Sequence, residues 1–279
     1  MKFSANLGFL WTGLSLPEAI RRAAGAGFDA VECHWPFDED PGAVRAALEE
    51  TGLPMLGLNT LRGDVAAGEA GLAAVPGRYA RAREVIDQAV AYAARIGARN
   101  VHVMAGVACG GQARATYCEN LAYAAERAGA EGIGILIEPI NTRDIPGYHL
   151  NLVEDGADVI ARVGQDNVRL MFDCYHVQIM QGDLIRRIET HLDVIGHLQF
   201  AAAPSRAEPD TGEVAYDWLI PGSRRWVMTA IGGPSTSPPG RSRTDSAGWA
   251  RIAETDRRAV FGCFRGPGRA GNCHPLCIP

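Results

Sequence analysis

The 279-residue sequence has almost no lysine, since Lys2 is the only one. It also contains no apolar run of about 18 residues, the minimum that a membrane-spanning helix requires. Its first residues, MKFSANLGFLW, lack the charged segment, apolar core and cleavage site of a secretory signal. A net charge of −5 gives no electrostatic reason to expect nucleic acid or an anionic membrane as a partner. We therefore expect a cytoplasmic protein that binds a small molecule, and homo-oligomerisation is left open.

Paired cysteine motifs are missing as well. The seven cysteines are odd in number and none of them forms a C-x-x-C pair. The sequence thus indicates neither a disulfide framework nor a zinc site, and we expect free thiols. The glycine-rich stretch CGGQ at residues 109–112 lacks the lysine of a phosphate-binding loop and the strand-turn-helix context of a dinucleotide site.

Short apolar runs alternate with longer helical patterns up to about residue 220, which is typical of repeated strand-helix units and a parallel sheet. The length suits one large α/β domain. Seven strands are expected, at residues 3–7, 30–33, 54–58, 100–104, 134–138, 168–173 and 195–200. We therefore predict an α/β fold of the (β/α)8 TIM-barrel type, one strand short of closure.

Helix signals lie between these strands. Ser15, Pro17 and Glu18 form a capping box with proline in the first turn, and Gly25 and Gly27 follow as a stop. Residues 78–96 keep apolar side chains at spacings of three and four, and residues 113–130 do so less regularly. Both segments are predicted to be helices of the outer layer.

The composition changes sharply after residue 220. Of the 58 residues from 222 to 279, 33 are Gly, Ser, Arg, Thr or Pro, and such a mixture buries too little apolar surface to offset its ordering entropy. We expect a barrel domain at residues 1–220 and a disordered tail at 221–279. The eighth strand-helix unit would be replaced by this irregular tail, and the edges of the first and seventh strands would be exposed.

Polar residues interrupt the apolar strands near their carboxyl ends, where a parallel barrel forms its active face. The fifth strand ends in Glu138, the sixth in Asp173, and the seventh carries His197 and Gln199. Two carboxylates and an amide oxygen from three adjacent strands form a hard oxygen-rich set suited to Mg²⁺ or Mn²⁺. We predict a divalent metal site at Glu138, Asp173 and Gln199.

Each of these residues, taken alone, has a structural alternative. Any one of them can be a strand-end residue that bonds a nearby backbone amide, and His197 is interpreted as a satisfied core histidine. His176 either contacts a substrate oxygen or caps the following helix, and Arg206 either binds a substrate carboxylate or is a solvated loop charge. The role of His102 is left open.

Three segments resemble the hydroxypyruvate isomerase family and related two-oxo-tetronate isomerases. They are LIEPINTRDIPGYHLN (136–151), MFDCYHVQIMQGDL (171–184) and GHLQFAAAPSRAEPDTGEVAYDWL (196–219). The resemblance covers roughly residues 1–220. It implies that Glu138 is both a metal ligand and the acid-base residue, that Asp173 and Gln199 are further ligands, and that His176 and Arg206 contact the substrate.

The same resemblance implies the reaction. A metal polarises the carbonyl and hydroxyl of a hydroxy-keto acid and favours an enediolate, and hydroxypyruvate is converted to tartronate semialdehyde by two carboxylates that remove and return a proton. The alternatives are a 2-oxo-tetronate isomerase and a catalytically dead barrel that binds metal and sugar acid. A metal-dependent endonuclease on the same fold would need more histidine ligands than the sequence offers.

The sequence departs from the family where an eighth strand should supply a last glutamate. No glutamate occurs between Glu213 and Glu254, and the expected position falls near residues 234–235. A shifted reading frame restores the pattern. Across the codons of residues 226–229 it forces a glycine and, two positions later, an aspartate. Read through residue 238, this frame permits G-Y-D-G-Y-W-G-A-E-Y-V-P. We therefore expect a frameshift near codon 221 that impairs the enzyme by removing this glutamate.

Overall fold

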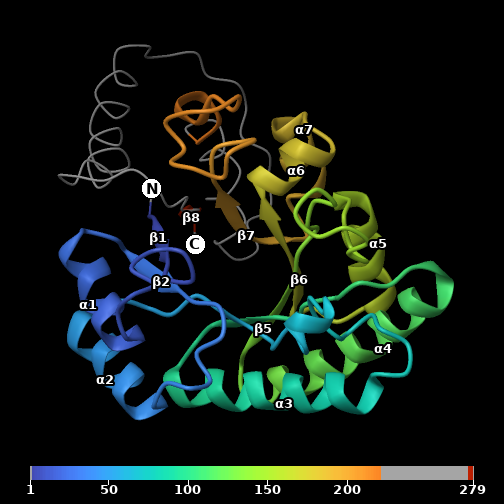
Figure 1. Cartoon of the computed structure of the whole chain (residues 1–279), viewed down its shortest axis with the longest axis horizontal. Coiled ribbons are helices and arrows are strands. Elements are labelled where there is room, and N and C mark those ends of the chain that lie inside the picture. Colours follow the sequence, from blue (N-terminus) through green and yellow to red (C-terminus); the bar gives the residue numbers. More distant parts are fainter. Residues whose placement is uncertain (1, 221–275, 279) are drawn as a thin grey trace, which may run out of the picture.

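Strands occupy the centre of the molecule and helices surround them (Figure 1). A computed structural model describes residues 2–220 and 276–278. The strands are β1 (Ser4–Asn6), β2 (Ala30–Glu32), β3 (Leu58–Asn59), β4 (Asn100–His102), β5 (Gly134–Ile137), β6 (Val168–Asp173), β7 (Ile195–Phe200) and β8 (Leu276–Ile278). The helices are α1 (Leu16–Gly25), α2 (Pro41–Thr51), η1 (Val65–Ala67), α3 (Tyr79–Ile96), α4 (Gly110–Gly129), α5 (Val153–Val163), α6 (Cys174–Met180) and α7 (Leu184–His191).

The strands form one sheet in the order β2-β1-β8-β7-β6-β5-β4-β3. The pairs within β3 to β7 and the pair β1 with β2 are parallel. A parallel bridge between Val31 and Met55 joins the two ends of this order. The sheet is therefore closed, as the predicted barrel requires, and the carboxyl ends of its parallel strands lie at one mouth.

β8 lies in the gap between β1 and β7, and it runs antiparallel to both. Cys277 is in register with Ser4 on one side and with Gln199 on the other. The expectation of exposed edges on the first and seventh strands therefore does not hold, because main-chain pairing covers both. The predicted frameshift boundary and the missing glutamate near residues 234–235 lie outside the described residues.

Local sequence features explain where the helices begin and end. The Glu18 carboxylate accepts a hydrogen bond from the Ser15 backbone amide at 3.1 Å, which confirms the predicted capping box of α1. Asp40 caps α2 by accepting from the amide of Ala43 at 2.9 Å. Gly97 ends α3 in the left-handed region at φ 73°, where glycine carries no steric penalty.

The core lies between the barrel and its helices, and buried aromatic hydroxyls tie the two together. The Tyr117 hydroxyl on α4 donates to the Val103 carbonyl oxygen at 3.1 Å, while the Tyr148 hydroxyl accepts from the Ala105 amide at 2.9 Å. Both tyrosines are fully buried, so these bonds satisfy hydroxyls that would otherwise be costly to bury. They fix the loop after β4 beside the mouth of the barrel.

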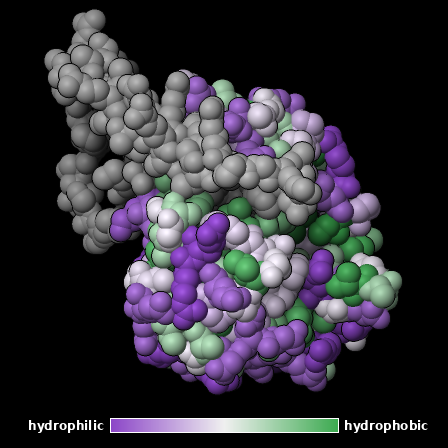
Figure 2. Space-filling view, turned by 60° about the vertical axis from the view of Figure 1, so that its left-hand side comes forward, coloured by the Kyte–Doolittle hydropathy of each residue, from purple (hydrophilic) through white to green (hydrophobic). Residues whose placement is uncertain are grey.

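The described surface is mixed in character. Hydrophilic residues cover much of the face in Figure 2, and hydrophobic residues are interspersed among them in small groups. Within residues 2–220 and 276–278, no helix is both long and apolar enough to cross a membrane.

Candidate metal centre and its pocket

A cavity of about 330 Å³ opens at the carboxyl ends of the parallel strands. Its walls come from the loops after β1 to β5 and β7 as well as from the strands themselves. Four of the five predicted site residues line it, namely Glu138, His176, Gln199 and Arg206. The cavity therefore lies at the end of the barrel where the strand-end argument expected the active face.

Glu138, Asp173 and His176 form a buried cluster at the inner end of this cavity. One ligand atom from each residue lies within 4.8 Å of the other two. His176 Nε2 is 3.7 Å from Glu138 Oε1 and 3.7 Å from Asp173 Oδ2. The sequence predicted the two carboxylates as ligands, and it assigned His176 to the substrate instead of to this cluster.

Burial changes the acidity of all three groups. It raises the pKa of Glu138 well above its usual range, and the neighbouring charge of Asp173 raises it further. Burial raises the pKa of Asp173 to about 6, although the Arg206 guanidinium opposes this shift. Burial also lowers the pKa of His176 well below its usual value, with the positive charge of Arg206 adding to the effect. Without a cation, these carboxylates are held in an environment that disfavours their charged form.

The residues fit a divalent cation on the basis of one unsatisfied atom. Asp173 Oδ1 accepts a hydrogen bond from the Tyr175 amide at 2.8 Å. Asp173 Oδ2 is buried and has no hydrogen-bond partner among the described residues. A buried carboxylate oxygen without a donor, beside a second carboxylate and an imidazole, is the arrangement in which a hard cation replaces the missing partner.

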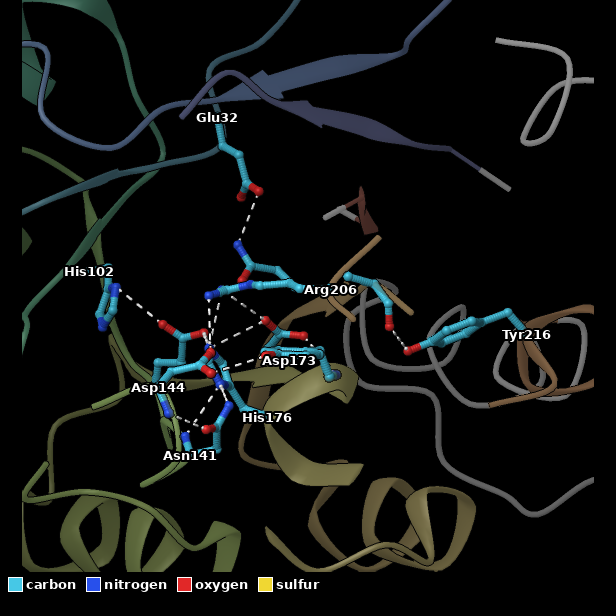
Figure 3. Close-up of polar contacts among 12 residues, drawn as sticks. Glu32, His102, Asn141, Asp144, Asp173, His176, Arg206 and Tyr216 are labelled. Carbon is cyan, nitrogen blue, oxygen red and sulfur yellow. Dashed lines mark hydrogen bonds and ion pairs between the residues drawn. The ribbon is translucent and has the colours of Figure 1, made fainter. Parts of the chain in front are cut away.

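Arg206 lies beside His176, and Figure 3 shows both next to Asp173 and Asp144. Arg206 Nη2 is 3.2 Å from His176 Nε2, and Nη1 donates to Asp144 at 3.4 Å. Arg206 Nη2 is also 3.8 Å from Asp173 Oδ2. On its other side, His176 Nδ1 lies 2.7 Å from the Asn141 side-chain amide. The imidazole is therefore held from both sides at the edge of the cluster.

Gln199 reaches the cavity from β7, where it is in register with Asp173 of β6. Its Nε2 donates to Glu32 Oε1 at 3.0 Å, and His197 Nε2 lies 2.8 Å from Glu32 Oε2. All three side chains are buried. Because the Gln199 amide nitrogen faces Glu32, the amide oxygen points away from Glu32. His197 has the buried polar partner expected of a satisfied core histidine.

Glu32 is a residue of the cavity that the sequence analysis missed. It ends β2 and points from there toward the opposite strands (Figure 3). A carboxylate that interrupts the apolar run Ala30-Val31 was the available signal, since it is the same signal that identified Glu138. His102, left open above, lines the cavity with Nδ1 3.7 Å from Glu138 Oε2, and burial lowers its pKa to about 3.

A sequence profile described as a xylose isomerase-like TIM barrel matches residues 20–221, which is well over half of the chain. The chain belongs to this family. The match confirms the predicted fold and the predicted kinship with sugar isomerases.

Relatives place the chain more narrowly. It is 45% identical to the 2-oxo-tetronate isomerase of Cupriavidus necator over 78% of this chain and 86% of that one. It is 39% identical to the hydroxypyruvate isomerase of Escherichia coli over 79% of this chain and 87% of that one. The predicted membership of the hydroxypyruvate isomerase group, and with it the isomerase class, is confirmed.

Solved structures agree on the architecture. A crystal structure named AP endonuclease, family 2, from Brucella melitensis superposes with a TM-score of 0.77 at 37% identity, covering 81% of this chain and 89% of that one. L-ribulose 3-epimerase superposes with a TM-score of 0.72 at 19% identity, over 97% of this chain and 100% of that one. The second likeness is one of fold alone.

Proposed function

We propose that this barrel is built for the isomerisation of a small hydroxy-keto acid, with hydroxypyruvate and 2-hydroxy-3-oxopropanoate (tartronate semialdehyde) as the pair it interconverts. The observation that carries the proposal is the buried cluster of Glu138, Asp173 and His176 with an unsatisfied Asp173 oxygen, at the inner end of a cavity that two arginines line. The names of the relatives supply the substrate class.

Glu138, Asp173 and Gln199 would hold Mg²⁺ or Mn²⁺, and His176 is close enough to contribute as a ligand or to contact the substrate. When bound, such a cation polarises the carbonyl and hydroxyl oxygens of the substrate. The cluster supplies the two negative charges that the cation needs. The amide of Gln199 adds a neutral oxygen whose direction is set by Glu32.

Glu138 is the candidate base. Its raised pKa favours taking up a proton, in this case from the hydroxymethyl carbon of hydroxypyruvate. The carbon left behind becomes part of an enediolate, and a proton returned to the neighbouring carbon gives the aldehyde product. Arg206 is placed to contact the oxygens of the substrate from the side of His176.

The return of the proton requires a second acid. Among the described residues at the cavity, no glutamate comes from an eighth parallel strand, because β8 runs antiparallel. A frameshift near codon 221 accounts for this difference from the family. The chain with the present sequence is then a weakened isomerase or a barrel that binds metal and sugar acid without turnover.

A 2-oxo-tetronate isomerase is the second candidate. The relative from Cupriavidus necator that carries this name is the more similar of the two described above, at 45% identity. The two candidates share the cation, the base and the enediolate chemistry. They differ in the length of the substrate beyond the reacting carbons.

The test is an isomerisation assay of hydroxypyruvate and of 2-oxo-tetronate with Mg²⁺ or Mn²⁺. The present chain is compared with a version whose reading frame is restored after codon 220, and the gene is sequenced through codon 221. Activity in the restored protein alone is the expected result. Equal activity in both proteins would refute the role given to the missing glutamate, and no activity in either would refute the proposed function.

A further inference from the structure

Arg62 lies on the loop after β3, where it lines the same cavity and is partly exposed, unlike the buried residues of the cluster. Its guanidinium carbon is 4.0 Å from the centre of the Trp35 ring. The indole is fixed in turn, because Trp35 Nε1 donates to the Thr60 carbonyl oxygen at 3.0 Å. The backbone of Arg62 is also held, since its carbonyl oxygen accepts from the Gly71 amide at 2.9 Å. A cation stacked on an anchored ring keeps its planar face and its donors in a defined place.

A row of aromatic rings in edge-on and tilted contact connects Arg62 with Arg206 along the wall of the cavity. The Trp35 ring lies 4.9 Å from the His34 ring, and the His34 ring lies 4.7 Å from the Phe9 ring. The Arg206 guanidinium lies 4.9 Å from the centre of Phe9. All five residues line the cavity. The two arginines therefore bracket one aromatic wall.

Only one of these arginines is already engaged by acidic side chains. Arg206 is close to Asp144 and Asp173 and contacts His176. Arg62 has no carboxylate within ion-pair distance in the described part of the chain. Glu69, further along the same loop, is paired with Arg78 instead. Arg62 thus offers an uncompensated guanidinium to whatever enters the cavity.

A positively charged side chain at the cavity would favour the binding of an anionic substrate. Its wall and inner end carry the carboxylates of Glu32, Glu138 and Asp144, and an anionic substrate entering beside them is repelled unless a cation receives its charge. Arg206 already offsets part of this negative charge, because it lies within 4 Å of both Asp144 and Asp173. A further guanidinium that lines the cavity is free to receive the carboxylate of a substrate whose carbonyl end faces the metal cluster.

We infer that Arg62, stacked on Trp35, is the subsite for the carboxylate of the substrate, and that it makes the cavity select acids over neutral sugars. The inference rests on the proposed function, since it specifies how that substrate is oriented. Planar guanidinium donors match a carboxylate in two parallel hydrogen bonds. Arg206 then contacts the hydroxyl or carbonyl oxygens near the reacting carbons instead of the carboxylate.

Two ligands that differ at one group test this assignment. Hydroxypyruvate and dihydroxyacetone share a hydroxymethyl ketone, and only the first has a carboxylate. Calorimetric binding of both is measured with the full chain in Mn²⁺, for the wild type and for Arg62→Gln, Arg62→Lys and Arg22→Gln. Arg22 is an exposed arginine of α1 away from the cavity, so its variant matches the charge change without touching the site. Thermal melting checks that each variant is folded.

In Arg62→Gln, hydroxypyruvate is expected to bind about ten- to a hundredfold more weakly, with dihydroxyacetone affected less than about twofold. Arg62→Lys should recover part of the loss, and Arg22→Gln should match the wild type. If the wild type prefers hydroxypyruvate and Arg62→Gln keeps that preference, the subsite is overturned while the proposed function stands. If the wild type binds neither ligand, the proposed function fails and the subsite fails with it.

Discussion

Gln199 Nε2 on β7 and Glu32 Oε1 on β2 are joined by a hydrogen bond of 3.0 Å that crosses the interior of the barrel. The bond decides which end of the Gln199 amide is available, because a carboxylate accepts only from the amide nitrogen. The oxygen end is left for the cavity, where the proposed function uses it as a ligand of a hard cation. In the proposed site, Glu32 therefore acts as a positioning residue for Gln199.

Replacing Glu32 tests this relationship. In Glu32→Ala the amide of Gln199 is released and can rotate, so Mn²⁺ affinity is expected to fall roughly 10- to 100-fold, as for other residues that orient a ligand. Glu32→Gln, which keeps an acceptor, should fall less. The free Mn²⁺ signal in electron paramagnetic resonance gives the affinity directly. An affinity equal to that of the wild type in Glu32→Ala would show that Gln199 is not a ligand.

Removing the charge of Glu138 should have opposite effects on metal binding and on stability. Glu138→Gln loses a carboxylate ligand, so Mn²⁺ should no longer raise the Tm. The metal-free variant should melt roughly 2–4 °C above the metal-free wild type, because a buried carboxylate with a raised pKa opposes folding. Calorimetric melting with EDTA and with Mn²⁺ measures both effects. Glu119→Gln, an exposed change on α4, is the control and should leave both values unchanged.

The stabilisation by metal should depend on pH. The Asp173 pKa of about 6 lies above its usual value of 3.8, so the folded protein binds more protons than the unfolded chain between these two values. The free energy of unfolding of the metal-free protein therefore falls as the pH rises through this window. Mn²⁺ needs the ionised carboxylate, so the Tm gain on adding Mn²⁺ should grow from pH 5 to pH 7.5. A gain that is the same at both pH values would contradict this.

Closure of the barrel should depend on the main chain of β8. Proline cannot donate a backbone hydrogen bond, so Cys277→Pro removes a bond from a strand that lies between two neighbours. The free energy of unfolding is expected to fall by about 1–3 kcal/mol, and the opened edges should promote association. Cys277→Ala keeps the backbone and serves as the matched control. Thermal melting and light scattering give the two readouts, and equal behaviour of the two variants would refute the pairing.

The order of strands and helices was predictable because apolar periodicity and capping residues are local properties. β6 (Val168–Asp173) and β7 (Ile195–Phe200) begin and end at the predicted residues. The third strand is the weakest prediction, since residues 54–58 were expected and only Leu58–Asn59 is regular. β8 was not predicted, because three residues that pair across 76 to 273 positions of sequence leave no periodic signal for a local argument to detect.

The part of the candidate site that lies at strand ends was predictable from the sequence. Glu138 and Asp173 follow from a polar residue that ends an apolar strand, and the structure brings them together. The pairing of Gln199 with Glu32 was not accessible, because it joins β7 to β2 through the barrel interior. Arg62 was missed for a different reason: it lies in a loop, where an arginine is ordinarily solvated and only the contact with Trp35 distinguishes it.

The parallel strands of the barrel both close the sheet and deliver residues to its mouth. β8 runs antiparallel to its neighbours, so it can do the first without the second. Main-chain hydrogen bonds do not depend on the side-chain sequence. An extended segment that runs in either direction can therefore complete the sheet between β7 and β1. Strand direction matters for the site, because only a strand whose carboxyl end lies at the mouth of the barrel is followed there by a loop that can carry site residues. Closure of the sheet and the supply of side chains to the mouth are thus separate properties, and β8 provides the first through its backbone pairing.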